Sequence, residues 1–119
     1  MTALRILVVE DDALVAMTVE DLLEDLGCVV VGSVASVAEA TGWLEGGTAF
    51  DAALLDLSLR DGLVFPVADI LAQRGVPFAF TTGYGEVPGG HHPDAPKLGK
   101  PIRREALEAV LRAFGSVEP

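Results

Sequence analysis

The chain carries acidic, hydroxyl and ammonium side chains directly after short apolar runs, and this spacing can assemble one reactive site. Glu10 and Asp11 follow the first apolar run, and Asp56 lies near the end of another. Thr82 ends a further run, and Lys100 closes the last short one. If these runs are parallel strands of one sheet, their carboxyl ends share an edge, and the polar residues would meet there.

Three carboxylates at one edge constrain the chemistry of such a site. Glu10, Asp11 and Asp56 would repel one another unless a cation lay among them. Oxygen ligands favour a hard divalent ion, Mg²⁺ with Mn²⁺ as the alternative, over zinc. With the charge neutralised, a carboxylate oxygen can attack phosphorus, while the metal, the Thr82 hydroxyl and the Lys100 ammonium bind the oxygens of the transferred phosphoryl group. The pattern therefore favours phosphoryl chemistry.

The elements that must position these residues alternate along the chain. Apolar periodicity and turn residues predict strands at 4–9, 28–34, 52–57, 76–82 and 97–100, and helices at 13–26, 36–45, 64–74 and 102–114. Residues 83–96 are rich in Gly and Pro, so we expect a long loop with at most one turn of helix. Alternation of this kind predicts an α/β fold, in which helices cover both faces of a parallel sheet.

The composition excludes several classes of function. The 119 residues suit one domain, expected to span 1–119 with no output domain. The 8 basic and 18 acidic side chains give a net charge of −10, which argues against direct binding to nucleic acid because its phosphates are neutralised by Lys and Arg. No apolar run approaches the roughly 20 residues that span a bilayer, and the N-terminus lacks a signal-peptide pattern. We therefore expect a cytoplasmic protein without membrane insertion.

Taken together, the polar residues resemble those of the receiver domain of two-component response regulators, and the resemblance covers the whole chain. Glu10 and Asp11 in ILVVEDD resemble the acidic metal pair of that family, and Asp56 in AALLDLS resembles its phosphoacceptor. Thr82 in FTTG resembles the switch hydroxyl, and Lys100 in GKP resembles the lysine that pairs with the phosphoryl group.

The resemblance implies further features that the residue pattern alone does not give. It implies a flavodoxin-like (βα)5 fold, a doubly wound parallel sheet with strand order 2-1-3-4-5, here with the fourth helix short or absent. It also implies that the backbone carbonyl of Ser58 is a metal ligand and that the peptide bond before Pro101 is cis.

The sequence departs from the common receiver pattern at several positions. Arg60 stands where the family usually has Pro, and Gly62 arrives two residues early, so the loop after Asp56 is shortened. Residues 77–85, PFAFTTGYG, resemble the PFxFATGxG signature of a stand-alone subgroup in alphaproteobacterial stress signalling. Lys97 occupies the position of the usual switch aromatic, so Tyr84 is a candidate substitute and a candidate shield of the phosphoryl group against water.

The resemblance implies a single-domain response regulator that accepts a phosphoryl group from a histidine kinase or a histidine phosphotransfer protein. It would then signal to an unknown downstream protein by contact, pass the group on, or act as a phosphate sink, catalysing only its own phosphorylation and dephosphorylation. One alternative is a small Mg²⁺-dependent phosphohydrolase, although no second Asp follows Asp56 by two residues and no cap domain is present. The other alternative is an interaction module that no longer depends on phosphorylation.

Other conspicuous residues have simpler explanations. Asp12 is expected to lie at the N-terminus of the first helix, where the helix dipole favours a carboxylate, rather than to bind metal. Thr81 is expected to point away from the side that Thr82 faces, because side chains alternate along a strand. His91 and His92 lack a spaced third metal ligand, so we expect them to belong to a solvated loop.

Overall fold

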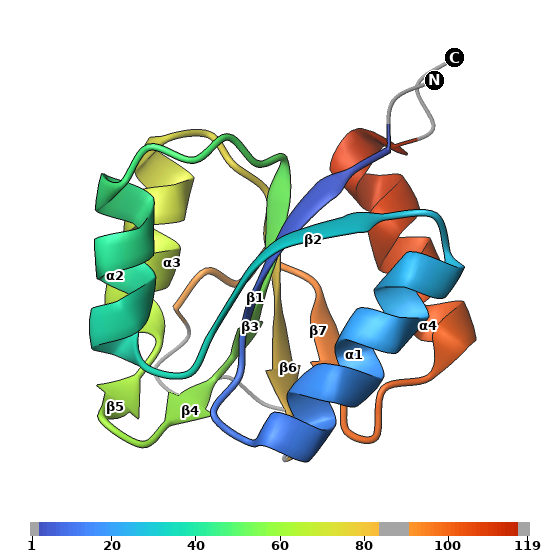
Figure 1. Cartoon of the computed structure of the whole chain (residues 1–119), viewed down its shortest axis with the longest axis horizontal. Helices are drawn as coiled ribbons and strands as arrows, with labels where there is room; N and C mark the ends of the chain where they lie inside the picture. Colours follow the sequence, from blue (N-terminus) through green and yellow to red (C-terminus); the bar gives the residue numbers. More distant parts are fainter. Residues whose placement is uncertain (1–2, 84–90, 117–119) are drawn as a thin grey trace.

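The computed structural model describes residues 3–83 and 91–116, and its core is one parallel sheet in the order β2-β1-β3-β6-β7 (Figure 1). Counted along the chain, this is the predicted order 2-1-3-4-5, so the flavodoxin-like α/β fold is confirmed. The strands are β1 (Arg5–Val9), β2 (Val29–Val34), β3 (Ala52–Asp56), β6 (Phe78–Thr82) and β7 (Lys97–Gly99).

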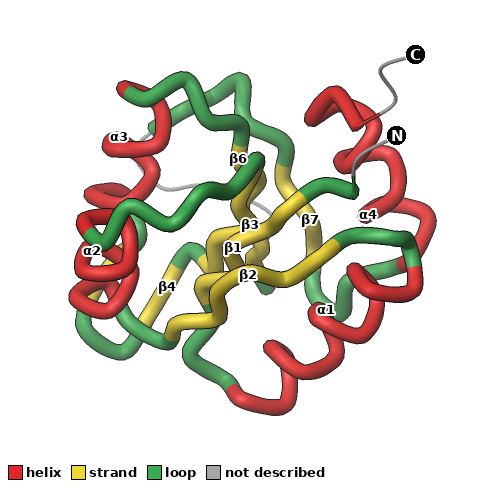
Figure 2. Tube along the Cα trace, turned by 45° about the horizontal axis from the view of Figure 1, so that its top comes forward, coloured by secondary structure: helices red, strands yellow, loops and turns green. Residues whose placement is uncertain are grey.

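Two pairs of helices cover the sheet, one pair on each face (Figures 1 and 2). One face packs against α1 (Ala13–Asp25) and α4 (Arg104–Leu111), beyond which the chain continues through Arg112–Ser116 and kinks at Gly115, where φ is +92°. The other face packs against α2 (Val37–Glu45) and α3 (Phe65–Gln73). Among the described residues, no helix combines the length and the apolarity that crossing a bilayer requires.

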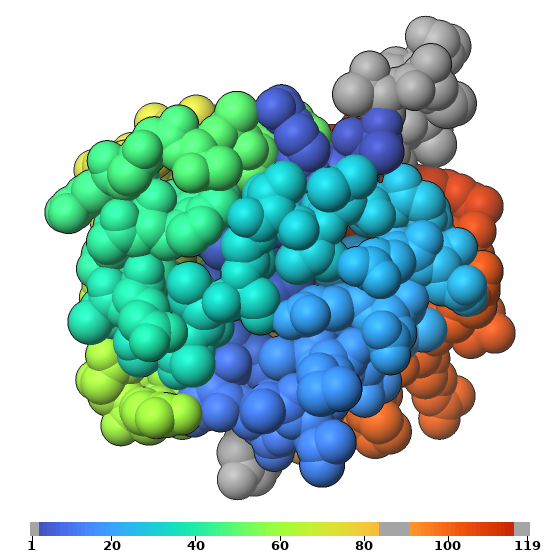
Figure 3. All heavy atoms as spheres, viewed as in Figure 1, coloured from blue at the N-terminus to red at the C-terminus, as the bar shows by residue number. Residues whose placement is uncertain are grey.

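Alternation along the central strands divides the core into two layers. In β1, Leu7 and Val9 pack on the α2/α3 side, while Ile6 and Val8 pack on the α1/α4 side, and all four are at most 2% exposed. This double burial explains why the central strands are nearly continuous apolar runs. The edge strand β2 is more exposed and lies at the surface between α1 and α2 in the space-filling view (Figure 3).

The edge strand and α2 fit together around a glycine. A Cβ atom at Gly32 in β2 would lie 2.6 Å from the Trp43 ring of α2, closer than atoms can approach. The Trp43 ring also packs edge-on against Phe50, with 5.1 Å between ring centroids. Only glycine therefore admits the indole at this point, and Trp43 has a packing role.

Local signals in the sequence account for the helix ends. The Asp12 carboxylate accepts hydrogen bonds from the backbone N–H groups of Leu14 and Val15 and caps α1, as expected. The α1 helix ends before Gly27, which adopts φ +89°, a conformation that glycine tolerates best. The Ser36 hydroxyl caps α2 by accepting from the Glu39 N–H.

A short antiparallel hairpin follows β3 and was not predicted. It consists of β4 (Ser58–Leu59) and β5 (Gly62–Leu63), in which Ser58 pairs with Leu63 and Leu59 pairs with Gly62. Gly62 has φ +137°, a conformation that residues with a side chain rarely adopt. The shortened loop after Asp56 is therefore a defined element rather than irregular chain.

The connection between β6 and β7 contains no helix within its described part, residue 83 and residues 91–96. Of its two histidines, His91 is exposed, as a solvated loop predicts, but His92 is half-buried, so the prediction was wrong for His92. The His91 ring stacks on Phe65 of α3 at 4.1 Å between centroids, and His92 Nε2 lies 2.7 Å from an Asp69 carboxylate oxygen of the same helix. The histidines therefore fasten this connection to α3, an arrangement that Gly/Pro-rich composition does not reveal.

Candidate functional site

Three carboxylates meet at the carboxyl edge of the sheet. Glu10 follows β1, Asp11 comes next in the chain, and Asp56 is the last residue of β3. Each offers a carboxylate oxygen, and these oxygens all lie within 4.8 Å of one another. Glu10 and Asp56 are buried, at 5% and 6% exposure, whereas Asp11 is half-buried. The cluster therefore combines two desolvated acids with one that faces solvent.

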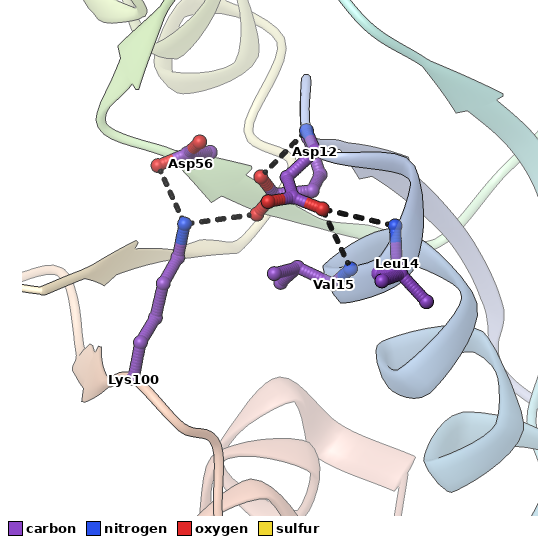
Figure 4. A network of polar contacts seen from close by, with 6 residues as sticks. Asp12, Leu14, Val15, Asp56 and Lys100 are labelled. Atoms are coloured by element: carbon purple, nitrogen blue, oxygen red, sulfur yellow. Dashed lines mark hydrogen bonds and ion pairs between the residues drawn. The ribbon is translucent and has the colours of Figure 1, made fainter.

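The turn from β1 into α1 fixes the direction of the Glu10 side chain. The Glu10 N–H donates to the Val34 carbonyl at 2.9 Å, which extends the pairing of β1 with β2 by one residue. The Glu10 carboxylate accepts from the Asp12 N–H at 3.1 Å. Because Asp12 is itself held by its bonds to α1, as Figure 4 shows, its carboxylate faces the helix and is not part of the cluster.

Lys100 supplies the cation of the site. Its Nζ lies 3.0 Å from Glu10 Oε1 and 3.1 Å from Asp56 Oδ1, so one ammonium bridges two buried carboxylates (Figure 4). The backbone holds Lys100 in place, because its N–H donates to the Thr82 carbonyl at 3.1 Å. The Lys100–Pro101 peptide bond is cis.

Burial and charge shift the proton equilibria of this cluster in a specific way. Burial, reinforced by the Glu10 charge, raises the pKa of Asp56 to about 6 against the opposing effect of Lys100. Burial lowers the pKa of Lys100, but its contacts with Glu10 and Asp56 raise it by more, so the net shift is upward. One ammonium is thus shared between two acids and does not fully compensate the negative charge.

The uncompensated charge and the donor set fit a divalent cation. The three carboxylates present hard oxygen donors within reach of one ion, and Mg²⁺ is commonly held by one or two carboxylates together with water and phosphate oxygens. Glu10, Asp11 and Asp56 could therefore hold Mg²⁺ or Mn²⁺, as the sequence predicts.

The two threonines at the end of β6 are both buried, at 3% exposure each. Thr81 is the register partner of Asp56, and its carbonyl accepts from the Leu57 N–H at 3.1 Å. Thr82 is one residue further along and pairs with Gly99 of β7. The alternation of side chains therefore places the two hydroxyls on opposite faces of the sheet.

The remaining candidate residues lie around this edge or outside the described part of the chain. Ser58 begins the hairpin two residues after Asp56, and its side chain is exposed. Pro101 follows Lys100 and lines a pocket of about 330 Å³ with residues of α1. Tyr84 lies outside the described residues.

Sequence reasoning missed Asp61, which reaches from the hairpin to α2. Its two carboxylate oxygens accept from the N–H groups of Val37 and Ala38, at 2.8 and 3.1 Å. The Asp61-Gly62 pair is a common turn signal, so the turn could have been found from the sequence. The contact of Asp61 with α2 could not have been found in this way, because Val37 and Ala38 are 24 and 23 residues away in the sequence.

Comparisons with known proteins find relatives that share this fold, although no family model matches the chain. The chain is 42% identical to SdrG from Sphingomonas melonis Fr1, with a TM-score of 0.83 over 96% of this chain and 98% of that one. A BeF3-activated conformation of SdrG, from Pseudomonas melonis Fr1, gives 43% identity and a TM-score of 0.79 over 96% of this chain and 98% of that one.

Two further relatives are forms of the regulator PhyR. The response regulator REC domain of Erythrobacter litoralis PhyR is 28% identical, with a TM-score of 0.83 over 96% of this chain and 91% of that one. The phyllosphere-induced regulator PhyR of Methylorubrum extorquens is 33% identical over 113 residues, which are 92% of this chain and 42% of the relative's length. The chain thus spans less than half of that protein. With this fold, this set of residues at the sheet edge and these relatives, the chain belongs to the receiver-domain family of response regulators.

Proposed function

We propose that this receiver domain accepts a phosphoryl group on Asp56 from the phosphohistidine of a histidine kinase or a histidine phosphotransfer protein. The observation that carries the proposal is the Lys100 ammonium, which lies within 3.1 Å of both Asp56 and Glu10 at the carboxyl edge of the sheet. The BeF3-activated structure of the relative SdrG supports it, because that protein responds to a compound with the shape of a phosphoryl group.

In the proposed step, an ionised carboxylate oxygen of Asp56 attacks phosphorus. The new O–P bond forms as the P–N bond of phosphohistidine breaks, and the departing imidazole nitrogen keeps the electron pair and takes a proton from solvent. Lys100 turns from its carboxylate partners to the phosphoryl oxygens and compensates their charge. The product is an acyl phosphate on Asp56.

Glu10, Asp11 and Asp56 would hold Mg²⁺, with the Ser58 backbone carbonyl as a further ligand. When bound, the ion neutralises charge on the phosphoryl oxygens and on the carboxylates. These acids therefore serve to keep a cation beside the nucleophile. A bound ion would also compensate the charge of two buried carboxylates that share one ammonium.

The Thr82 hydroxyl would bind a phosphoryl oxygen and thereby register the modification. Tyr84, two residues on, would shield the acyl phosphate from water. Tyr84→Ala should then shorten the half-life of the phosphorylated protein, and an unchanged or longer half-life would refute the shielding role.

A protein donor has to reach this edge, and α1 offers a surface beside it. Leu14 and Met17 are exposed apolar side chains, at 74% and 59%, on the first turns of the helix that follows the acidic cluster. Leu14 also lines the pocket that contains Lys100. We propose that a phosphohistidine-bearing helix packs here. Leu14→Ser should therefore slow transfer from a phosphohistidine protein about tenfold and leave phosphorylation by acetyl phosphate unchanged, whereas equal rates with both donors would contradict this docking site.

The direct test is transfer of labelled phosphate from a phosphohistidine donor to three forms of the protein. Wild type and Asp51→Asn should be labelled equally, because Asp51 lies at the opposite end of β3 from the site. Asp56→Asn should take up no label. Stoichiometric labelling of Asp56→Asn would refute the assignment of the phosphoacceptor.

A further inference from the structure

The hairpin that follows Asp56 is fixed at both of its ends. At its base, the Leu57 N–H donates to the Thr81 carbonyl at 3.1 Å, and the Val64 N–H donates back to the Leu57 carbonyl at 3.0 Å. Leu57 and Leu59 are buried in the core layer below α2 and α3. The base therefore belongs to the rigid sheet edge that carries Asp56.

The tip of the hairpin is fastened to a different element, α2. Asp61 uses one carboxylate oxygen for the Val37 N–H and the other for the Ala38 N–H, the first two residues of the helix. The hydrogen bond to Val37 lowers the pKa of Asp61, so its charged form is the one that the helix binds. The same helix already has a cap of its own, because Ser36 Oγ accepts from the Glu39 N–H at 3.0 Å. Ser36 satisfies only the Glu39 N–H, and Asp61 satisfies the Val37 and Ala38 N–H groups, so the first turn of α2 is fully capped only while the hairpin is docked on it.

The hairpin tip also borders the acidic cluster. Arg60, the residue before Asp61, lines a hollow of about 340 Å³ together with Glu10, Asp11 and Glu39 of α2. Most of the lining comes from α1 and β2, with Arg60 from the hairpin and Glu39 from α2, so the hollow joins the hairpin to two of the acids of the cluster. A shift of the hairpin would change the wall of the hollow and the backbone of Ser58, which begins the hairpin.

We propose that Asp61 is a positioning residue, which holds the Ser58–Leu63 hairpin against α2 and thereby sets the affinity of the acidic cluster for Mg²⁺. The inference rests on the proposed function, because it concerns the metal of that same site. Coupling of this kind is reciprocal. If the fastening of Asp61 strengthens Mg²⁺ binding, then Mg²⁺ must strengthen the fastening of Asp61 by the same factor.

The chain offers a matched pair of variants that separates positioning from helix capping. Asp61→Ala and Ser36→Ala each remove a side-chain cap from the N-terminus of α2, but only Asp61 connects that helix to the hairpin. We expect Mg²⁺, titrated by calorimetry into the full chain, to bind Asp61→Ala about five- to tenfold more weakly than wild type. Ser36→Ala should bind Mg²⁺ within twofold of wild type, although both variants lose thermal stability.

Two further measurements keep the proposal testable if Asp61→Ala does not fold. Asp61→Asn retains a carbonyl oxygen for one of the two N–H groups and should bind Mg²⁺ with an affinity between those of wild type and Asp61→Ala. In wild type, saturating Mg²⁺ should slow hydrogen exchange at Val37 and Ala38 by the same five- to tenfold factor. The Glu39 amide, which Ser36 caps, should show a smaller change.

The outcomes distinguish this inference from the proposed function. Equal Mg²⁺ affinity in wild type, Asp61→Ala and Ser36→Ala would overturn the positioning role and leave the phosphoacceptor proposal standing. A parallel loss of affinity in Asp61→Ala and Ser36→Ala would also overturn it, because helix capping alone would then be responsible. If wild type neither binds Mg²⁺ nor is phosphorylated, both proposals fail together.

Discussion

An aspartate lies at each end of β3 and pairs with a cation, but the two carboxylates have pKa values shifted in opposite directions. Asp51 immediately precedes the strand and pairs with Arg5, whose Nε and guanidinium N–H groups and backbone N–H all donate to its carboxylate, at 2.8 to 3.1 Å. Asp56 ends the strand and shares the Lys100 ammonium with Glu10. Hydrogen bonds from Arg5 lower the pKa of Asp51, whereas burial and the Glu10 charge raise the pKa of Asp56 to about 6.

The difference between the two ends separates a structural ion pair from a reactive one. Asp51 is 30% exposed and has a cation to itself, so its carboxylate is satisfied in the resting protein. The side chain of Asp56 is 8% exposed and shares its cation, so a bound metal ion can compensate the remaining negative charge. We therefore expect substitutions at the Asp56 end to change phosphorylation and metal binding, and those at the Asp51 end to change stability alone.

The largest effect is expected from removing the shared cation. Lys100→Met should slow phosphorylation by acetyl phosphate about 10²-fold or more, because no ammonium would stabilise the phosphoryl oxygens. It should also raise the pKa of Asp56 further above 6, which NMR titration of the carboxyl carbon measures.

The control for this variant lies at the other end of the strand. Arg5→Met removes a cation from a carboxylate in the same way but should leave the phosphorylation rate and the Asp56 pKa unchanged. A rate for Lys100→Met within twofold of wild type would show that the ammonium does not serve the reaction.

The next effect concerns the metal. Mg²⁺ at about 100 times its dissociation constant should stabilise wild type by about 2.7 kcal/mol, measured as a rise in the unfolding temperature over the same protein in EDTA. Asp11→Asn should lose most of this rise, and Asp51→Asn should keep all of it. An equal rise in all three proteins would mean that the ion binds elsewhere.

Smaller effects are expected from pH in EDTA, with opposite signs at the two ends. The folded state holds a proton on Asp56 up to about pH 6, whereas the unfolded chain releases it near 3.8, so this group lowers stability as pH rises through that window. Above pH 6, the free energy of unfolding of Asp56→Asn should therefore exceed that of wild type by roughly 1–2 kcal/mol, seen as a higher unfolding temperature, and the difference should vanish near pH 4.

Asp51 should behave in the reverse way. Because folding lowers the pKa of Asp51, this group stabilises the folded state at pH values above its unfolded pKa of 3.8. That stability is lost as the pH falls through the lower pKa of the folded state. Asp51→Asn should thus cost about 1 kcal/mol at pH 7 and progressively less below pH 4, as followed by thermal unfolding. The same sign of pH dependence for both variants would contradict the comparison on which these predictions rest.

The sequence sufficed for those features that depend on short-range pattern and on strand ends. Apolar runs followed by Glu10, Asp56 and Lys100 predicted both the parallel sheet and the meeting of these side chains, because parallel strands end at one edge. Helix ends at Asp12 and Gly27 followed from capping preferences, which act over a few residues.

Features that depend on contacts between distant residues escaped prediction. The link from Asp61 to α2 and the packing of His92 against Asp69 both join residues more than 20 positions apart. The Gly/Pro-rich composition around His92 is typical of a solvated loop and therefore gave the wrong prediction for this residue. The pKa of Asp56 also required the structure, because burial and the position of Glu10 decide it.

Intact-mass measurement is the most direct test of whether Asp56 is a metal-dependent phosphoacceptor. After incubation with acetyl phosphate, we expect the protein to gain one phosphoryl group with Mg²⁺ and none in EDTA, and the modified peptide to contain Asp56. No gain with Mg²⁺, an equal gain in EDTA, or a gain that persists in Asp56→Asn would contradict it.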